Sequence, residues 1–275
     1  MSAQRNDDVT VVISCFNYGR FLPDAVTSAK EQRGGPTRIV VVDDGSTEEA
    51  THAVLDRLEQ DPQVELIRQG NAGASAARNA GLAKVSTPYA LVLDGDDLIP
   101  AYAVQTLRAA LESDSAAGYA YGHIEFFGNQ SGVMRMPPFD PWRLLFRHIV
   151  GPTALMRSQM VFDVGGYDPA FDHYEDWEIW LHALAKGWSG RQVDVTGLLQ
   201  RKHGPSKFGG DRADYRRSFA RLRAKHQALY GDLGRIADQS QLGLPERVLY
   251  RCVWGARPWP ARAETALYSL LWRPT

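Results

Sequence analysis

Residues 89–97 read YALVLDGDD, an apolar run that ends in an acidic turn, and this stretch decides the fold. A continuous apolar run is typical of a strand buried on both faces, as in a parallel sheet. Two earlier runs have the same form: VTVVI at 9–13 leads into SCFNY, and IVVV at 39–42 leads into DDGST. Weaker strands are expected at 64–67 and 118–127.

Between these runs, apolar residues recur at helical spacing. Helices are expected at 21–29, around 54–58, at 74–82 and at 100–111. Alternating strands and helices predict right-handed crossovers and a mainly parallel α/β sheet flanked by helices. In such sheets ligands bind outside the carboxyl ends of the strands. We therefore expect the loops SCFNY, DDGST and DGDD to lie on one side of the sheet.

The composition excludes several classes of protein. The 275 residues are 44% hydrophobic and 23% charged, which is ordinary for a globular chain and not for a disordered or low-complexity one. No apolar run reaches the roughly 18 residues of a membrane-spanning helix, and no signal peptide is visible before the first strand. The two cysteines, Cys15 and Cys252, predict neither a disulfide framework nor a zinc site. A cytoplasmic location is therefore expected.

The charge is unevenly distributed along the chain. Residues 1–200 carry 16 Lys and Arg against 26 Asp and Glu, whereas residues 201–275 carry 15 against 6. From residue 211 the chain is expected to be helical to its end. Apolar stripes and interleaved tryptophans accompany the arginines there; the stripes are Val248, Leu249, Cys252 and Val253, then Leu267, Leu270 and Leu271, and the tryptophans are Trp254, Trp259 and Trp272. Two interpretations remain open: docking on an anionic membrane surface, or packing against the acidic body. Nucleic-acid binding is not expected, because no reading module is visible.

The acidic residues at the strand ends favour a metal ion. Asp94, Asp96 and Asp97, with Asp44 from another loop, would repel one another, and a divalent cation would offset this repulsion. Carboxylate ligands favour Mg²⁺ or Mn²⁺ over zinc, and substrate phosphates commonly complete the coordination of these ions. The alternative is that DGDD is only a turn that opens the helix after Pro100.

The common phosphate-binding loops are absent from the sequence. Neither GxxxxGK[ST] nor a GxGxxG after the first strand is present, which argues against a P-loop ATPase and a nicotinamide dehydrogenase. Asn71 and the glycine at 73 do precede a helix, whose N-terminus could face an anion. Arg78 on that helix could pair with a diphosphate, or could simply be a solvated arginine.

Seven blocks in order give the chain a family resemblance: SCFNYGRFL, IVVVDDGST, NAGASAARNAG, LVLDGDD, GGYDPAF, EDWEIWL and RKH. The series resembles glycosyltransferase family 2, the inverting enzymes of the Rossmann-like GT-A fold. It covers residues 9–203, nearly three quarters of the chain. The resemblance implies a catalytic domain at 1–205, with a nucleotide-binding half to about 115 and an acceptor-binding half after it. Residues 206–275 would form a basic helical C-terminal extension.

The resemblance also implies roles for individual residues. The expected nucleotide-sugar contacts are Ser14, Phe16, Asn17, Asp44, Asn71, Arg78, Asp94 and Gly95. Phe16 stands where tyrosine is more frequent, which keeps a stacking ring but removes its hydroxyl. Asp96 would bind the metal, and His203 would lie near the metal and the diphosphate. Asp176 would be the general base, with Glu175 binding or positioning the acceptor. Asp176 could otherwise be only a favourable charge at a helix N-terminus, and His203 an ordinary loop histidine.

Together these expectations describe a Mn²⁺- or Mg²⁺-dependent inverting transferase. It would move a sugar from a nucleotide-diphosphate donor, a UDP-sugar, to a hydroxyl of a glycan or lipid-linked acceptor, working in the cytoplasm or on the cytoplasmic face of a membrane. Two alternatives remain open. One is a catalytically silent nucleotide-sugar-binding module. The other is a sugar nucleotidyltransferase, which would need a glycine- and lysine-rich loop where this chain has SCFNYGR.

Overall fold

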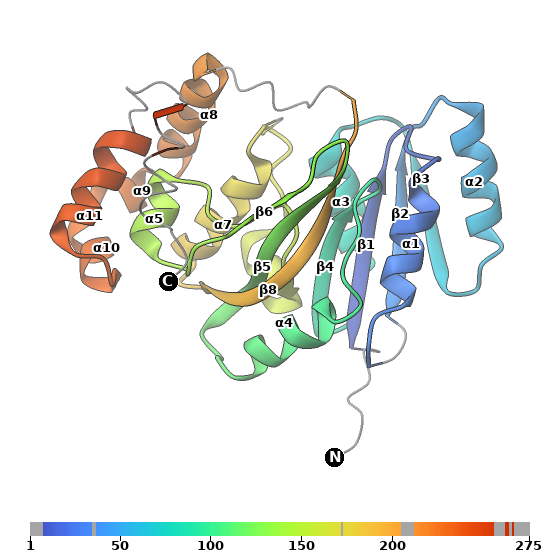
Figure 1. The fold of residues 1–275 in the computed structure, drawn as a ribbon, viewed down its shortest axis with the longest axis horizontal. Helices are drawn as coiled ribbons and strands as arrows, with labels where there is room; N and C mark the ends of the chain where they lie inside the picture. The colour runs from blue at the N-terminus through green and yellow to red at the C-terminus, as the bar shows by residue number, and fades with distance from the viewer. Residues whose placement is uncertain are drawn as a thin grey trace. The chain divides into compact units, whose positions relative to one another are not determined.

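The buried apolar runs form neighbouring strands of one sheet in the computed structural model (Figure 1). Strand β1 (Val9–Cys15) pairs in parallel with β2 (Arg38–Asp44) on one side and β4 (Tyr89–Asp94) on the other. Strand β3 (Val64–Gln69) extends the sheet beyond β2. Every β1 and β2 residue except Ser14 and Arg38 is buried, which is why these strands lack polar alternation.

The structure describes residues 8–34, 37–171, 173–204 and 212–255, together with 262, 263 and 266. Its contacts divide the chain into two units. The first, here called the sheet unit, comprises Met1–Met136 and Val150–Gly204. The second, the helical unit, comprises Pro137–Ile149 and Pro205–Thr275. The functional boundary expected at residue 205 and the nucleotide and acceptor halves stay predictions.

Antiparallel strands complete the sheet. Its order is β3-β2-β1-β4-β7-β5-β6, with β7 (Leu155–Arg157), β5 (Ala117–Gly128) and β6 (Gly132–Met134) each antiparallel to its neighbour. Strand β8 (Ser189–Lys202) runs parallel to β5 with several register shifts and also meets the loop after β4, where Leu98 and Leu199 form an isolated bridge. The expected mainly parallel sheet is confirmed, while β8 was not indicated by the sequence pattern.

Helices of the sheet unit pack on these strands. They are α1 (Leu22–Lys30), α2 (Glu49–Glu59), α3 (Ala74–Leu82), α4 (Ala103–Glu112), α6 (Ser158–Val164) and α7 (Glu175–Ala185). Helix α3 approaches β1 so closely that a Cβ on Gly81 would lie 2.2 Å from Val12 Cγ1. On α7, Trp177 and Trp180 are completely buried, which makes them core residues. This packing fixes the helix whose first turn carries Glu175 and Asp176.

The helical unit has its own apolar core. It contains α5 (Pro141–Phe146), α8 (Arg212–Lys225), α9 (Gln227–Gly231), α10 (Leu233–Gln239), α11 (Leu244–Leu249) and a π-helical turn, η1 (Tyr250–Trp254). The buried Asp140 caps α5 by accepting from Trp142 N and Arg143 N, and it also accepts from Ser240 Oγ. The expected helices are thus confirmed as far as Trp254.

The predicted apolar stripes have mixed outcomes. Val253 is buried, but Val248 is 51% exposed and Cys252 is also exposed, so the first stripe does not form one buried face. The second stripe, with Leu267, Leu270 and Leu271, lies outside the described residues, as do Trp259 and Trp272. Over the part of the chain that the structure describes, none of the helices combines the length and apolarity needed to cross a bilayer.

Candidate functional site

The acidic loop after β4 is held between β1 and β8. Gly95 N donates to Ser14 O at 2.9 Å, and a Cβ at position 95 would lie 2.9 Å from the same oxygen. Glycine is therefore needed for this close approach. Asp97 Oδ1 accepts from Arg201 N at 2.8 Å. Burial, together with the charges of Asp94 and Asp96, raises the pKa of Asp97 to about 8.

Asp96 meets His203 across this loop. His203 Nε2 lies 2.8 Å from Asp96 Oδ2, and Arg20 Nη2 lies 3.5 Å from His203 Nδ1. Because a guanidinium can only donate, Nδ1 accepts and Nε2 carries the proton that is donated to Asp96. The His203 ring packs against Phe21 and Tyr18, at centroid distances of 4.5 and 5.7 Å. The packing and both ring-nitrogen contacts hold the His203 side chain beside Asp96, and its role at a metal stays a prediction.

The donor chemistry of Asp96 and His203 fits a divalent cation. Burial and the charge of Asp94 raise the pKa of Asp96, while the hydrogen bond from His203 lowers it. Within the described ranges, no three His, Cys, Asp or Glu side chains form a complete protein cage for a metal. A magnesium-type ion does not need one, since it commonly takes one or two carboxylates and fills its other positions with substrate phosphates and water. The Asp96 carboxylate therefore fits an ion of this kind, and His203 Nε2 fits it once the ion replaces the proton that Nε2 donates to Asp96.

Arg78 links two acidic parts of the site. Its Nη2 lies 2.9 Å from Asp94 Oδ1 and its Nη1 lies 2.8 Å from Glu175 Oε1. The guanidinium is buried and lies 5.3 Å from the centre of the Tyr167 ring. Arg78 is thus not the solvated arginine considered above. It joins the end of β4 to the start of α7, and its contact with a nucleotide stays a prediction.

The start of α7 presents Asp176 in a buried position. Tyr174, which caps this helix, has the left-handed backbone angle φ of 62°. Asp176 Oδ1 accepts from Trp177 N at 2.9 Å. Burial is the main cause that raises the pKa of Asp176 to about 6, against the lowering effects of Arg78 and the Trp177 amide. The pKa of Glu175 is raised by burial and by the charge of Asp176. At neutral pH Asp176 is mostly ionised, as a general base must be.

Asn17 connects the first two loops. It adopts a left-handed conformation with φ of 57°, and its Oδ1 accepts from Thr47 N at 2.8 Å and Glu48 N at 3.1 Å. Its own backbone N donates to Ser46 Oγ. These contacts give the Asn17 amide a role in holding the loops. The preceding Phe16 is 38% exposed, as a ring available for stacking would be.

Asp44, the last residue of β2, contacts the loop before α3, which carries Asn71. Asp44 is buried and accepts from Gln69 Nε2, Ala72 N and Gly73 N at 2.8–2.9 Å. Its charge is therefore offset by amide donors, whereas the expectation above had a cation offset it. Asn71 is exposed on the same loop. Ser14 Oγ is 3.4 Å from Asp94 Oδ1, so the first-strand loop also contacts the acidic turn.

Two arginines of the site were not selected from the sequence, although both lie in blocks quoted above. Arg20 contacts His203, and its guanidinium lies 4.3 Å from the centre of the Phe21 ring. Arg201 donates through Nε to Asp96 O and through Nη2 to Asp24 Oδ2. It also stacks on Phe21. These cations surround the acidic turn with positive charge.

The contacts gather the predicted residues into three linked groups. Ser14, Asp94, Arg78 and Glu175 form a continuous chain of contacts, and Asp176 follows Glu175 directly. Asp96 and His203 form a second group with Arg20. Asn17 and Asp44 hold the two remaining loops. The expected roles in binding and catalysis stay predictions for all of these residues.

Comparison with known proteins identifies the family of the chain. A family model described as Glycosyl transferase family 2 matches residues 10–162, more than half of the chain. Glycosyltransferase GlyA of Streptococcus pneumoniae is 35% identical over 126 residues, which are 45% of this chain and 18% of that protein. Succinoglycan biosynthesis protein ExoO of Rhizobium meliloti is 38% identical over 112 residues, 40% of this chain and 31% of that protein. The chain thus spans well under half of either relative.

A solved structure confirms the fold class. The S. aureus protein TarS, residues 1–349 in complex with UDP-GlcNAc, has a TM-score of 0.65 and 15% sequence identity. The match covers 87% of this chain and 69% of that one. The Rossmann-like GT-A sheet with C-terminal helices is therefore confirmed as the fold. With the family model matched over more than half its length, the chain belongs to glycosyltransferase family 2.

Proposed function

We propose that this chain is a metal-dependent inverting glycosyltransferase. It takes a sugar from a nucleotide-diphosphate donor, a UDP-sugar, and transfers it to a hydroxyl of a glycan or lipid-linked acceptor. The observation that carries the proposal is the ion-pair chain from Asp94 through Arg78 to Glu175. These ion pairs join the acidic turn after β4 to α7, whose second residue is the buried Asp176. The proposed site thereby combines Asp96, which would bind the metal ion, with Asp176, which would accept the proton of the acceptor hydroxyl.

The donor assignment draws support from the relatives. TarS was solved with UDP-GlcNAc, and relatives named for glycan synthesis include ExoO, a succinoglycan biosynthesis protein. In this chain the exposed Phe16 ring would stack on the base. Asn17 and Asp44 would shape the loops around the nucleotide. These loops follow the carboxyl ends of β1 and β2, where ligands of open α/β sheets bind.

Asp176 acts as the general base in this proposal. Its carboxylate takes the proton of the acceptor hydroxyl as that oxygen bonds to the anomeric carbon. The bond from this carbon to the diphosphate breaks on the opposite face, and the nucleoside diphosphate leaves. A single displacement of this kind inverts the configuration. Arg78 and Glu175 position the start of α7 against the acidic turn.

The leaving diphosphate needs positive charge near it. Asp96 and His203 would hold a Mn²⁺ or Mg²⁺ ion, which when bound supplies Lewis-acid stabilisation of the diphosphate charge. Arg20 adds a guanidinium on the far side of His203. Guanidinium groups bind phosphate oxygens well, because their donors form a fixed planar fork.

A donor panel with Mn²⁺ tests the proposal directly. A true donor at a hundredfold excess over its Kd stabilises the folded chain by about 2.7 kcal/mol, a rise of roughly 5 °C in Tm. We expect one UDP-sugar to give this rise with Mn²⁺ and not with EDTA. The variant Asp96→Ala should lose the rise, while the exposed Asp56→Ala should keep it. Equal rises with and without the metal would exclude the metal-dependent mechanism.

A further inference from the structure

The outer side of α8 is a strongly basic surface that the donor site does not use. The segment from Arg212 to Gly231 contains six Lys and Arg residues and one acid, Asp214. Five of the basic side chains are exposed: Arg216, Arg217, Arg221, Arg223 and Lys225. Charges of one sign four positions apart on one helix repel one another, and together they attract an anionic surface to this side of α8.

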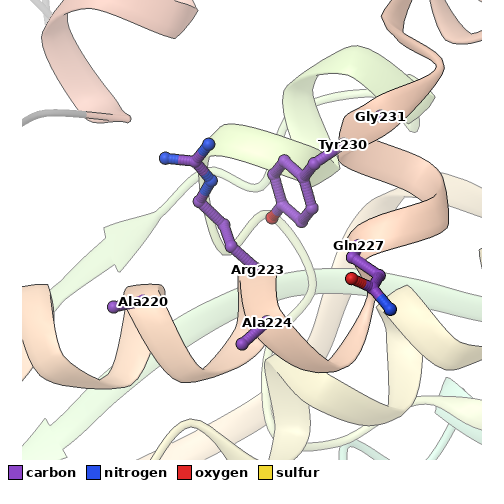
Figure 2. A pocket seen from close by; sticks show the side chains of 6 residues that line it. All are labelled: Ala220, Arg223, Ala224, Gln227, Tyr230 and Gly231. Carbon is purple, nitrogen blue, oxygen red and sulfur yellow. The ribbon is translucent and has the colours of Figure 1, made fainter.

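An open groove of about 410 Å³ lies along this surface, between α8 and α9 (Figure 2). Its lining combines small apolar residues with a cation, an amide and an aromatic ring: Ala220, Arg223, Ala224, Gln227, Tyr230 and Gly231. The Arg223 side chain rises from α8 beside the Tyr230 ring, with its guanidinium 5.5 Å from the ring centre. Tyr230 Oη donates to Leu145 O, so the ring has a fixed position.

Arg223 is the cation in this groove, and its charge is not neutralised there. Its recorded interaction is with the face of the Tyr230 ring, and it makes no ion pair with any carboxylate of the described residues. An arginine stacked on an aromatic ring keeps its outward N–H donors available to a second group. The group that matches a planar donor fork is a phosphate or carboxylate.

We propose that this basic groove docks the protein on an anionic phospholipid surface, with Arg223 receiving a headgroup phosphate. Two observations favour a lipid surface over another polyanion. Three lining residues of the groove, Ala220, Ala224 and Gly231, carry no polar side-chain group. Helix α11 of the same unit exposes two apolar side chains one turn apart, Leu244 at 68% and Val248 at 51%. Arginine and tyrosine beside apolar residues are typical of protein surfaces at a lipid interface.

Vesicle sedimentation of the full-length chain tests this surface without donor or acceptor. We expect binding to vesicles of phosphatidylcholine with phosphatidylglycerol, little binding to phosphatidylcholine alone, and release as salt rises. The triple variant Arg217→Glu, Arg221→Glu, Arg223→Glu should weaken partitioning by about 100-fold or more. The single variant Arg223→Gln should weaken it by several-fold, and thermal melts check that both variants are folded.

A matched control separates this surface from the overall charge. The variant Arg57→Glu, Lys84→Glu, Arg191→Glu reverses three exposed charges of the sheet unit. It should bind vesicles nearly as well as the parent chain. Equal loss in both triple variants, or no preference for anionic vesicles, would overturn the proposal. Binding of a single-stranded RNA in place of vesicles would also overturn it. Because no sugar transfer is measured, the outcome is independent of the proposed enzymatic function.

Discussion

At the scale of single residues, Asp176 is the side chain whose environment best suits a chemical role, that of a general base. A carboxylate works as a general base when its pKa lies near the working pH and the group is still ionised. Burial raises the pKa of Asp176 to about 6, and the nearby Arg78 and Trp177 amide limit the rise. An exposed aspartate at a helix N-terminus would instead be a weaker base, because the helix dipole favours its charged form.

Replacing Asp176 by asparagine should lower kcat by at least about 100-fold, since proton transfer from the acceptor is lost. In the parent chain the ionised form is active, so activity should rise with pH through about 6 and level off above it. The variant should lack this rise. Initial rates from pH 4.5 to 8 with a fixed donor measure both effects, with Asp56→Asn as the exposed control. This rise of activity through about pH 6 is the acid limb of the pH profile. If the acid limb is unchanged in Asp176→Asn, it reports the titration of another group.

Glu175 lies beside Asp176 but has a different role, because it forms an ion pair with Arg78. The variant Glu175→Gln removes a negative charge next to Asp176 and leaves Arg78 with one carboxylate fewer to neutralise it. Both changes favour the ionised form of Asp176, so the acid limb should move to lower pH. We expect kcat above this limb to stay within about tenfold of the parent value. A loss as large as that of Asp176→Asn, with no shift of the limb, would make Glu175 a catalytic residue.

At the scale of elements, the sequence predicted the strands that are buried on both faces and could not predict β8. Continuous apolar runs are visible in β1, β2 and β4 because all their positions except Ser14, Arg38 and Asp94 are buried. Strand β8 mixes buried, half-buried and exposed positions without a regular period, and its pairing with β5 shifts register three times. Bulges of this kind break the two-residue period on which strand prediction rests.

Contacts between distant residues of the site could not be predicted from the sequence. The His203–Asp96 contact joins residues 107 positions apart, and the Arg78–Glu175 pair joins residues 97 apart. The resemblance placed these residues in a common site, but only the fold shows which of them touch. For the same reason the sequence could not reveal that Asn17 and Asp44 hold loops through backbone amides.

The loop contacts of Asn17 lead to a prediction for the start of α2. Asn17→Ala removes the acceptor for Thr47 N and Glu48 N and places alanine at a positive φ. The two effects together should lower the free energy of unfolding by about 2 kcal/mol, or Tm by roughly 4 °C. Asn17→Asp keeps the acceptor and should cost less than half as much. Equal melting temperatures for the two variants would mean that the amide oxygen does not stabilise these loops.

At the scale of the whole molecule, charge is balanced overall and unbalanced locally. The chain carries 31 basic and 32 acidic residues, so repulsion from net charge is small near neutral pH. The buried carboxyls of the sheet unit differ, because ionising them is costly even though the net charge is small. The pKa values of Asp96, Asp97, Glu175 and Asp176 are all raised, chiefly by burial. The dependence of stability on pH should therefore reflect these few groups more than the total charge.

The last prediction concerns this dependence. A carboxyl whose pKa is higher in the folded chain than in the unfolded one binds its proton more tightly when folded, so stability falls as pH rises from about 4 through the folded pKa. For Asp176 the fall should end above pH 6, and for Asp97 it should continue to about pH 8. Asp97→Asn should remove the part of this loss of stability that extends to the highest pH, because asparagine has no charge to bury. In EDTA, we expect this variant to melt above the parent chain at pH 8 by several degrees and near it at pH 5. Parallel melting curves for the two proteins across this range would show that Asp97 is ionised in both states and that another donor compensates its burial.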